Sequence, residues 1–227
     1  MRTLIAPTQK TLVRIEGTHA TPVTNVTLQN VIFAHSAPTY FEQYIVPSPG
    51  DWSVHRGGAV YMRNVRGVTL ANCTLARLGG NGVALDGRVV GAQVRWKNGK
   101  KEKGPDDPRC LLFYLFFYIS CTSSTHTHSV TLRAQILGND LLLIGGSAIV
   151  IVGRVAGADS ADAEGVAEFP SLTRIARNLI DGVGVLGKQA AAIFQANALA
   201  TTIEGNVLFN GPLMILVTVI APPKSCS

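Results

Sequence analysis

One short phrase recurs along the chain: an apolar or β-branched run with a single Asn placed inside it. The copies contain Asn30, Asn72, Asn139, Asn178 and Asn206. A phrase that returns at intervals of tens of residues indicates stacked repeats, because one such unit cannot bury its own apolar face. We therefore expect an all-β solenoid, a right-handed parallel β-helix, with the Asn side chains stacked in a hydrogen-bonded ladder at one corner. The alternative is that these Asn are ordinary turn residues of an antiparallel sandwich.

The spacing of the Asn residues gives an expected coil length. Successive Asn residues are 42, 67, 39 and 28 positions apart. A coil of ~20–28 residues matches the last interval directly and matches 42 and 39 as two coils each. The interval of 67 contains residues 95–135, where the composition changes abruptly at both ends. Leaving out roughly 40 residues there reduces the interval to a single coil.

The spacing therefore divides the chain into four parts. We expect N-terminal β-helix coils over 1–94, a non-repeat insert over 95–135, continuing coils over 136–212 and a non-repeat apolar tail over 213–227. The insert is either a functional loop or a stretch foreign to the fold, such as untranslated sequence. We favour the second, although residues 129–135 echo the repeat phrase. We also expect the natural domain to continue beyond both ends, so that this chain is an incomplete β-helix.

Composition and charge exclude several classes of protein. Apolar residues make up 47% and charged residues 15%, which excludes a disordered chain. The net charge is +6, but residues 95–135 supply seven Lys or Arg and three Asp or Glu, or +4 of it. The basic signal is therefore one local tract, without a nucleic-acid-binding motif, and we expect no nucleic-acid partner. A nucleic-acid binder acting through residues 97–103 is the weakest alternative.

No membrane or export segment is evident from the sequence. No apolar run reaches the ~18–20 residues of a membrane span, so we expect no membrane partner. The N-terminus as given lacks an apolar signal region. The localisation stays open, and the protein would be secreted if the N-terminus is truncated. The oligomeric state is equally open.

The four Cys residues form no C-x-x-C pair, and no His lies at metal-ligand spacing from them. We expect neither a metal nor a cofactor. Cys73 lies inside a repeat phrase and is interpreted as a small core residue. Asn25-Val-Thr27 and Asn72-Cys-Thr74 match the N-glycosylation sequon. Because Asn72 belongs to a repeat phrase and no export signal is evident, we expect neither sequon to be used.

The repeat phrases resemble those of the right-handed parallel β-helix proteins, the pectin-lyase-like superfamily. Gly50-Asp-Trp-Ser-Val-His-Arg-Gly-Gly-Ala-Val60, with Asn206-Val-Leu-Phe-Asn-Gly-Pro212, is similar to its glycoside-hydrolase-like subset. The resemblance covers about residues 20–94 and 136–212. It implies a carbohydrate-active protein with a polysaccharide or glycan as partner, on the strength of fold-level analogy. It also implies that any catalytic residue beyond the last phrase is missing here.

Three residues are the catalytic candidates: Asp86, Asp51 and His55. Glycoside cleavage needs two carboxylates, and His transfers protons near neutral pH. Asp86 follows a short apolar run, so it is either a site carboxylate or a turn carboxylate that accepts backbone N–H bonds. Asp51 and His55 belong to the Gly50–Val60 phrase, which is alternatively a loop that packs Trp52 and pairs Arg56 with Asp51.

Four residues are the substrate-binding candidates: Trp52, Arg56, Lys188 and Gln189. Trp stacks on sugar rings and Arg binds carboxylates. Lys188 and Gln189 open a second run and are expected beside Asp86, or else in a solvated turn. The acidic residues Asp159, Asp162, Glu164 and Glu168 are interpreted as a solvated loop. The function expected is a glycoside hydrolase-like or polysaccharide-binding domain fragment, and an active enzyme would be a glycoside hydrolase or polysaccharide lyase-like. The alternative is a non-catalytic scaffold or inactive fragment.

Overall fold

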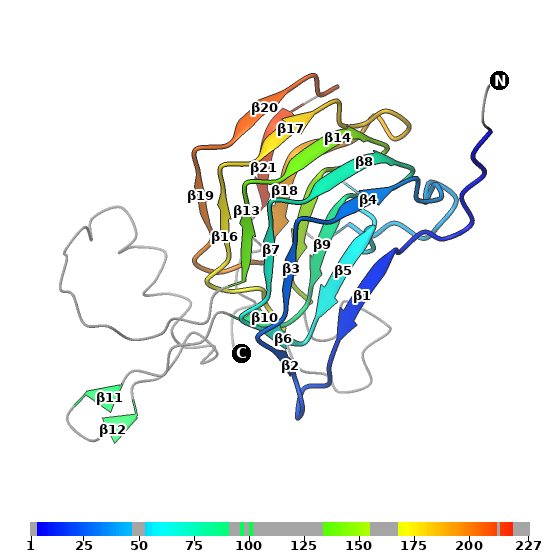
Figure 1. Ribbon diagram of the computed structural model, residues 1–227. Coiled ribbons are helices and arrows are strands. Elements are labelled where there is room, and N and C mark those ends of the chain that lie inside the picture. Colours follow the sequence, from blue (N-terminus) through cyan, green and yellow to red (C-terminus); the bar gives the residue numbers. More distant parts are fainter. Residues whose placement is uncertain are drawn as a thin grey trace.

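A computed structural model describes residues 4–46, 53–90, 96–97, 100–101, 134–154, 168–212 and 214–219. The described chain is a parallel β-helix, in which strands from successive coils stack side by side in parallel sheets (Figure 1). No helix occurs among the described residues. The expected all-β, parallel solenoid is therefore confirmed, and the antiparallel sandwich is wrong.

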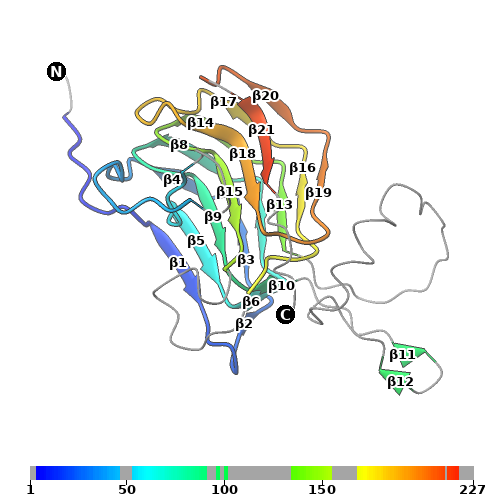
Figure 2. The same ribbon diagram turned by 180° about the vertical axis from the view of Figure 1, so that it is seen from behind.

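Four parallel sheets form the walls of the solenoid. Sheet A faces the viewer in Figure 2 and consists of β1 (Val13–Glu16), β5 (Val60–Arg63), β9 (Val83–Asp86), β15 (Ile149–Val152), β18 (Ala191–Ala196) and β21 (Met214–Val219). Sheet B consists of β2 (Val23–Thr24), β6 (Val65–Arg66) and β10 (Val89–Val90). Sheet C consists of β3 (Thr27–Gln29), β7 (Thr69–Ala71), β13 (Gln135–Leu137), β16 (Arg174–Ala176) and β19 (Thr202–Glu204). Sheet D consists of β4 (Ile32–Ala34), β8 (Thr74–Leu78), β14 (Asp140–Ile144), β17 (Leu179–Asp181) and β20 (Val207–Phe209).

The core is built from columns of like side chains, one from each coil. In sheet C the register aligns Leu70, Ile136 and Ile175, each no more than 1% exposed. Their neighbours along each strand point toward the other face, because side chains alternate between the two faces of a strand. Each coil thus buries its apolar face against the next coil, as the repeat pattern predicts.

The Asn ladder exists, but the register shows that it is offset from the sequence pattern by one residue. Asp140 pairs with Thr74 and with Leu179, so Asn139 lies beside Cys73 and Asn178. Asn139 Nδ2 donates to Asn178 Oδ1 at 2.9 Å, and Asn178 Nδ2 donates to Asn206 Oδ1 at 2.8 Å. The expected alignment is therefore wrong for the other two members, Asn30 and Asn72. Both align instead with the residue before Asn139, so at the same corner they lie one position earlier than the residues of the ladder.

Cys73 occupies the rung that precedes Asn139 and takes the place of an Asn there. Its backbone N–H donates to Asn139 Oδ1 at 2.9 Å. Its Sγ lies 3.6 Å from the carbonyl oxygen of Leu28. The contact is equivalent to one made by Asn139 in the next coil: Leu28 aligns with Leu70, and the carbonyl of Leu70 accepts a hydrogen bond from Asn139 Nδ2 at 3.1 Å. Cys73 is 2% exposed, so the interpretation as a small core residue is confirmed.

The intervals of 42 and 39 residues correspond to one coil each, and the expectation of two coils is wrong. Leu28 pairs directly with Leu70, and Ile136 pairs directly with Ile175, with no coil between them. The additional residues of the first interval lie between β4 and β5, and the structure describes residues 35–46 and 53–58 of them. This segment is the 35–58 loop.

The 67-residue interval also contains a single coil. Val65 pairs with Val89, and Thr69 pairs with Gln135. Val65 and Thr69 are 4 residues apart, whereas their partners are 46 apart. Because Gln135 lies in β13, the coil has resumed by that residue. Between residues 95 and 133 the structure describes only the antiparallel pair β11 (Trp96–Lys97) and β12 (Lys100–Lys101).

The expected apolar tail is described only over Met214–Val219. These residues form β21, which continues sheet A beside β18 in parallel register. Sheet A therefore contains one more strand than the repeat phrases alone indicate.

Candidate functional site

The 35–58 loop packs on the outer face of sheet A. Ile45 and Val54 of the loop form an antiparallel bridge with backbone hydrogen bonds of 3.0 and 2.9 Å. Val54 is 4% exposed and joins a second apolar cluster with Val150 and Phe194, which belong to β15 and β18. Burial of apolar side chains on the outside of the sheet therefore fixes the loop to the solenoid.

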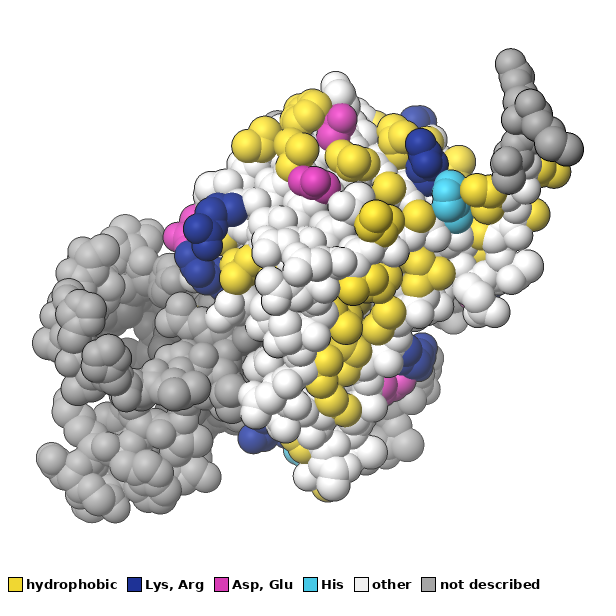
Figure 3. Space-filling view, in the orientation of Figure 1, with side chains coloured by type: hydrophobic (Ala, Val, Ile, Leu, Met, Phe, Trp, Pro, Cys, Tyr) yellow, Lys and Arg dark blue, Asp and Glu magenta, His cyan; other side chains and the backbone are white. Residues whose placement is uncertain are grey.

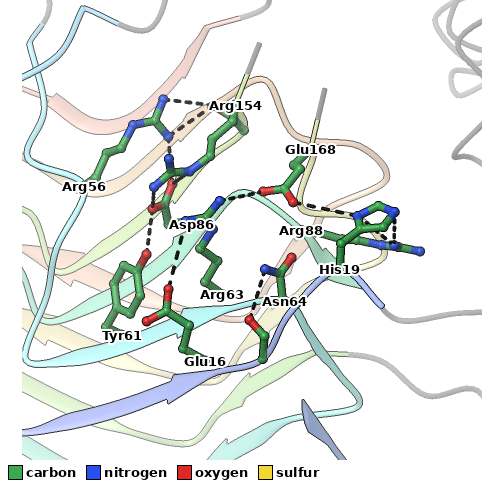
Figure 4. A network of polar contacts seen from close by, with 12 residues as sticks. Glu16, His19, Arg56, Tyr61, Arg63, Asn64, Asp86, Arg88, Arg154 and Glu168 are labelled. Carbon is green, nitrogen blue, oxygen red and sulfur yellow. Dashed lines mark hydrogen bonds and ion pairs between the residues drawn. The ribbon is translucent and has the colours of Figure 1, made fainter. Parts of the chain in front are cut away.

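Asp86 ends β9 and forms the centre of a polar network beside this loop (Figure 4). Its Oδ1 accepts from Arg56 Nη1 at 2.7 Å and from Arg154 Nε at 3.1 Å. Its Oδ2 accepts from Tyr61 Oη at 2.8 Å and from Arg154 Nη2 at 2.5 Å. A carboxylate has about four lone-pair sites, so this set of donors fills them all. Asp86 is 1% exposed, and a buried charge of this kind is tolerated because it is paired and hydrogen-bonded.

Tyr61 responds to the same carboxylate. Burial and the neighbouring Asp86 charge raise the pKa of the Tyr61 hydroxyl well above its ordinary value. The hydroxyl therefore stays protonated and donates a hydrogen bond to Asp86. The Arg14 guanidinium lies 4.6 Å from the centre of the Tyr61 ring, on its face. The phenol is thus held between a cation on its ring and a carboxylate at its tip.

The network continues through Glu168, the first described residue after 154. Glu168 exchanges two backbone hydrogen bonds with Arg154, of 2.7 and 2.9 Å. Its Oε2 lies 3.3 Å from Arg63 Nη2, and its Oε1 lies 3.9 Å from His19 Nδ1. Arg88 Nη1 contacts the same His19 ring. Glu168 is 7% exposed, so the interpretation as a solvated loop residue is wrong for this position.

Gly87 makes room for Glu168. It has a φ of +65°, a conformation that L side chains rarely adopt, and a Cβ there would lie 2.7 Å from Glu168 Oε2. A side chain at this position would therefore push away the second carboxylate of the network. The glycine after Asp86 is needed both for the turn and for this close approach.

Of the catalytic candidates, Asp86 lies at the end of its strand as expected, with its oxygens bonded to side chains. Asp51 lies outside the described residues. The His55 ring contacts its own loop, with Nδ1 3.3 Å from the carbonyl oxygen of Gly57 and the ring centre 5.6 Å from that of Tyr44. Desolvation by burial lowers the pKa of His55, which favours a neutral imidazole. Asn81 Nδ2 anchors the backbone here by donating to the carbonyl of His55 at 2.8 Å.

Among the described binding candidates, only Arg56 lies at Asp86. Arg56 pairs with Asp86 and also donates to the carbonyl of Gly153, at 3.3 Å. Trp52 and the alternative partner Asp51 lie outside the described residues. Lys188 Nζ donates to the carbonyl of Gly184 at 2.9 Å within its own turn.

Lys188 and Gln189 do not lie beside Asp86, and that expectation is wrong. Asp86 aligns with Val152 and, through it, with Ala196, at the C-terminal ends of these strands. Both candidates precede β18 and so lie at the opposite ends of the strands of sheet A. Gln189 Oε1 instead accepts from Ser53 Oγ at 2.8 Å, and this contact ties the 35–58 loop to that end.

Sequence reasoning missed most of the network, including Tyr61, Arg63, Arg154 and Glu168. The alternation of Val60-Tyr-Met-Arg63 contains a usable signal, since Val60 and Met62 belong to the main core and the residues between and after them must point outward. No comparable signal exists for Glu168, because it reaches the network through an isolated backbone bridge to Arg154 and belongs to no strand. Its position depends on tertiary contacts alone.

The 35–58 loop also exposes aromatic side chains. Phe41 is 88% exposed, Tyr40 53% and Tyr44 38%. The Tyr40 and Phe41 ring centres are 4.2 Å apart. Nearby, Lys10 and Glu42 form an ion pair that ties the N-terminal segment to the loop. By contrast, the face made by sheets C and D carries a band of apolar groups and few charges (Figure 3).

Among the described residues there is no helix long and apolar enough to cross a membrane, and no group of three or more His, Cys, Asp or Glu is placed to hold a metal ion. Comparison with protein-family models, curated proteins and solved structures finds no match to the chain.

Proposed function

We propose that this parallel β-helix is a polysaccharide-binding protein of the pectin-lyase-like type, with its glycan-binding surface on the 35–58 loop and the adjoining outer face of sheet A. The observation that carries the proposal is a loop fixed at several points that nevertheless exposes adjacent aromatic rings. Arg56 holds it to Asp86, Ser53 to Gln189, and Val54 to the second apolar cluster. The resemblance of the Gly50–Val60 phrase supports the same assignment.

Exposed aromatic rings on a fixed loop suit the recognition of sugars. The faces of pyranose rings present C–H groups, and these pack on the electron-rich face of an aromatic ring. Because residues 35–46 and 53–58 of the loop are held against the sheet, little conformational entropy of these residues is lost when the ligand binds. Arg14, Glu16 and Arg63 form a charged rim on the same sheet, and the Arg14 side chain is 60% exposed, so its guanidinium can reach hydroxyl or carboxylate groups.

Binding is favoured over cleavage at Asp86. A general acid or nucleophile must offer an oxygen to the substrate or to water. Both Asp86 oxygens are already engaged by two guanidiniums and a phenol. We therefore assign Asp86 the role of fixing the loop through Arg56.

The test is affinity electrophoresis of the purified chain through gels that contain homogalacturonan, a neutral β-glucan or a galactomannan. We expect at least one polysaccharide to retard the wild-type protein and Phe41→Ala to weaken that binding about tenfold, which corresponds to ~1.4 kcal/mol. Phe209→Ala is the matched control, since Phe209 is an exposed aromatic residue of sheet D, and its binding should equal that of the wild type. Failure of all three polysaccharides to retard the protein, or unchanged binding by Phe41→Ala, contradicts the proposal.

A second candidate is polysaccharide cleavage with Glu168 as the acid or base. Glu168 contacts Arg63 and His19, and the His19 side chain is 45% exposed, so this end of the network reaches solvent. Release of reducing ends from the retarded polysaccharide, lost in Glu168→Gln, would establish this candidate in place of simple binding.

A further inference from the structure

The one-residue offset of the ladder changes the position of a sequon. Asn72-Cys-Thr74 lies at the corner between β7 and β8, and Asn25-Val-Thr27 lies at the corner between β2 and β3 (Figure 1). If Asn72 were a rung of the ladder, its amide would be buried and bonded to the neighbouring coils. The register instead gives that rung to Cys73 and leaves Asn72 one position earlier.

The position that Asn72 occupies points outward in each described coil. Its column contains Asn30, Asn72, Gly138, Arg177 and Gly205, all of which have a φ between +52° and +60°. Each member of this column is exposed, whereas Cys73, Asn139 and Asn178 in the next column are buried. The left-handed conformation therefore turns these residues away from the core. A large group attached to Asn72 would extend into solvent.

The neighbouring coil leaves space for such a group. A Cβ at Gly138 would lie 2.9 Å from Asn72 Oδ1, so the Asn72 side chain lies over a position that has no side chain. Asn25 is also exposed and has a φ of +56°. Its backbone N–H donates to the carbonyl of Arg66, so the backbone makes this contact with the next coil.

We propose that Asn25 and Asn72 are acceptors of N-linked glycans. In this reaction the amide Nδ2 forms a bond to the anomeric carbon of a lipid-linked oligosaccharide. The bond from that carbon to the lipid pyrophosphate breaks, the pyrophosphate leaves, and Nδ2 loses one proton. The transfer requires an Asn-x-Ser/Thr motif, and both sites supply it with Thr. Because both corners point outward, the solenoid folds with the glycans attached.

The test uses the full chain, expressed behind a secretory leader in cultured animal cells. The secreted protein is digested with peptide-N-glycosidase in H2 18O, which converts each modified Asn to labelled Asp. We expect label at Asn25 and Asn72 and two steps in gel mobility. Thr27→Ala and Thr74→Ala should each remove one step while keeping the Asn at its corner.

A matched variant tests the geometry itself. Ile32 aligns with Thr74 and is 74% exposed, so Ile32→Thr completes an Asn-x-Thr sequon that begins at Asn30, the equivalent corner of the preceding coil. We expect a third glycan there and a thermal unfolding midpoint within a few degrees of that of the deglycosylated protein. Secreted protein without label, or glycosylated protein that is retained or aggregates, overturns the proposal.

Discussion

Asp86 shows how the environment of one residue determines what it can do. From the sequence it is a carboxylate at the end of a strand, which suits either catalysis or a turn. In the structure it accepts from Arg56, Arg154 and Tyr61 within 3.1 Å and is withdrawn from solvent. These contacts join the 35–58 loop to the sheet, since Arg56 belongs to that loop and Arg154 follows the end of β15. The residue thus connects the wall of the solenoid to its surface.

Replacement of Asp86 should affect stability before it affects chemistry. In Asp86→Asn the guanidiniums of Arg56 and Arg154 face a neutral amide in place of a carboxylate. Removing one partner of a buried ion pair lowers the free energy of unfolding by about 3–5 kcal/mol. We expect the midpoint of urea unfolding to fall accordingly. Asp181→Asn is the control: Asp181 is a partly exposed carboxylate that accepts from Asn210 at 2.8 Å, and its loss should cost under about 1 kcal/mol. Equal midpoints for Asp86→Asn and the wild type would contradict the role assigned to Asp86.

At the scale of the element, the corner between sheets C and D contains two columns with opposite roles. One column points outward with left-handed backbone and includes Asn30 and Asn72. The next points inward and carries the ladder from Cys73 through Asn206. Asn suits both columns for different reasons, because its short polar side chain tolerates positive φ and its amide can both donate and accept.

The two columns should differ sharply when their Asn residues are replaced. Asn178→Ala removes the acceptor for Asn139 and leaves buried N–H groups without a partner, so we expect a loss of about 2–4 kcal/mol in urea unfolding. Asn30→Gly removes an exposed side chain at a φ of +57°, where Gly is at no disadvantage, and should leave stability within about 0.5 kcal/mol of the wild type. Similar losses in both variants would show that the offset register is wrong.

At the scale of the whole molecule, long loops and a constant coil coexist. The intervals between neighbouring coils vary, yet every described strand of sheets C and D keeps its register with the next. Among the described residues, the 35–58 loop lies between β4 and β5, where it does not interrupt the columns of core side chains. The 35–58 loop uses this freedom to return onto the outer face of sheet A.

The register also defines how much of the chain the coil can lose. Three residues, Arg66, Gly67 and Val68, separate Val65 from Thr69. Their partners in the next coil, Val89 and Gln135, therefore also need three residues between them. Replacing residues 91–133 with one Gly leaves Val90, the new Gly and Ala134 between those partners. We expect a soluble protein with a β-rich circular dichroism spectrum and cooperative thermal unfolding.

A shorter junction provides the control for this deletion. Joining Val90 directly to Ala134 removes one residue, and a shift of one residue turns inward side chains outward. That variant should lose cooperative unfolding. Loss of folding in the variant that keeps the Gly would show that residues 91–133 are integral to the coil.

By itself, the sequence determined the architecture. Short apolar runs that recur with turns between them cannot bury their faces singly, so they stack as a parallel β-helix. The same pattern indicated that a strand ends at Asp86 and that Cys73 is a core residue. These features depend on local pattern, which the order of residues records directly.

Only the tertiary structure decided which Asn forms the ladder, which partner Arg56 takes and where Glu168 lies. A shift of one residue exchanges inside for outside, and two Asn-containing strings look alike in either register. The partners of Arg56 and Glu168 depend on where loops return to the wall. Loop length and composition do not specify that position; contacts between residues far apart in the chain do.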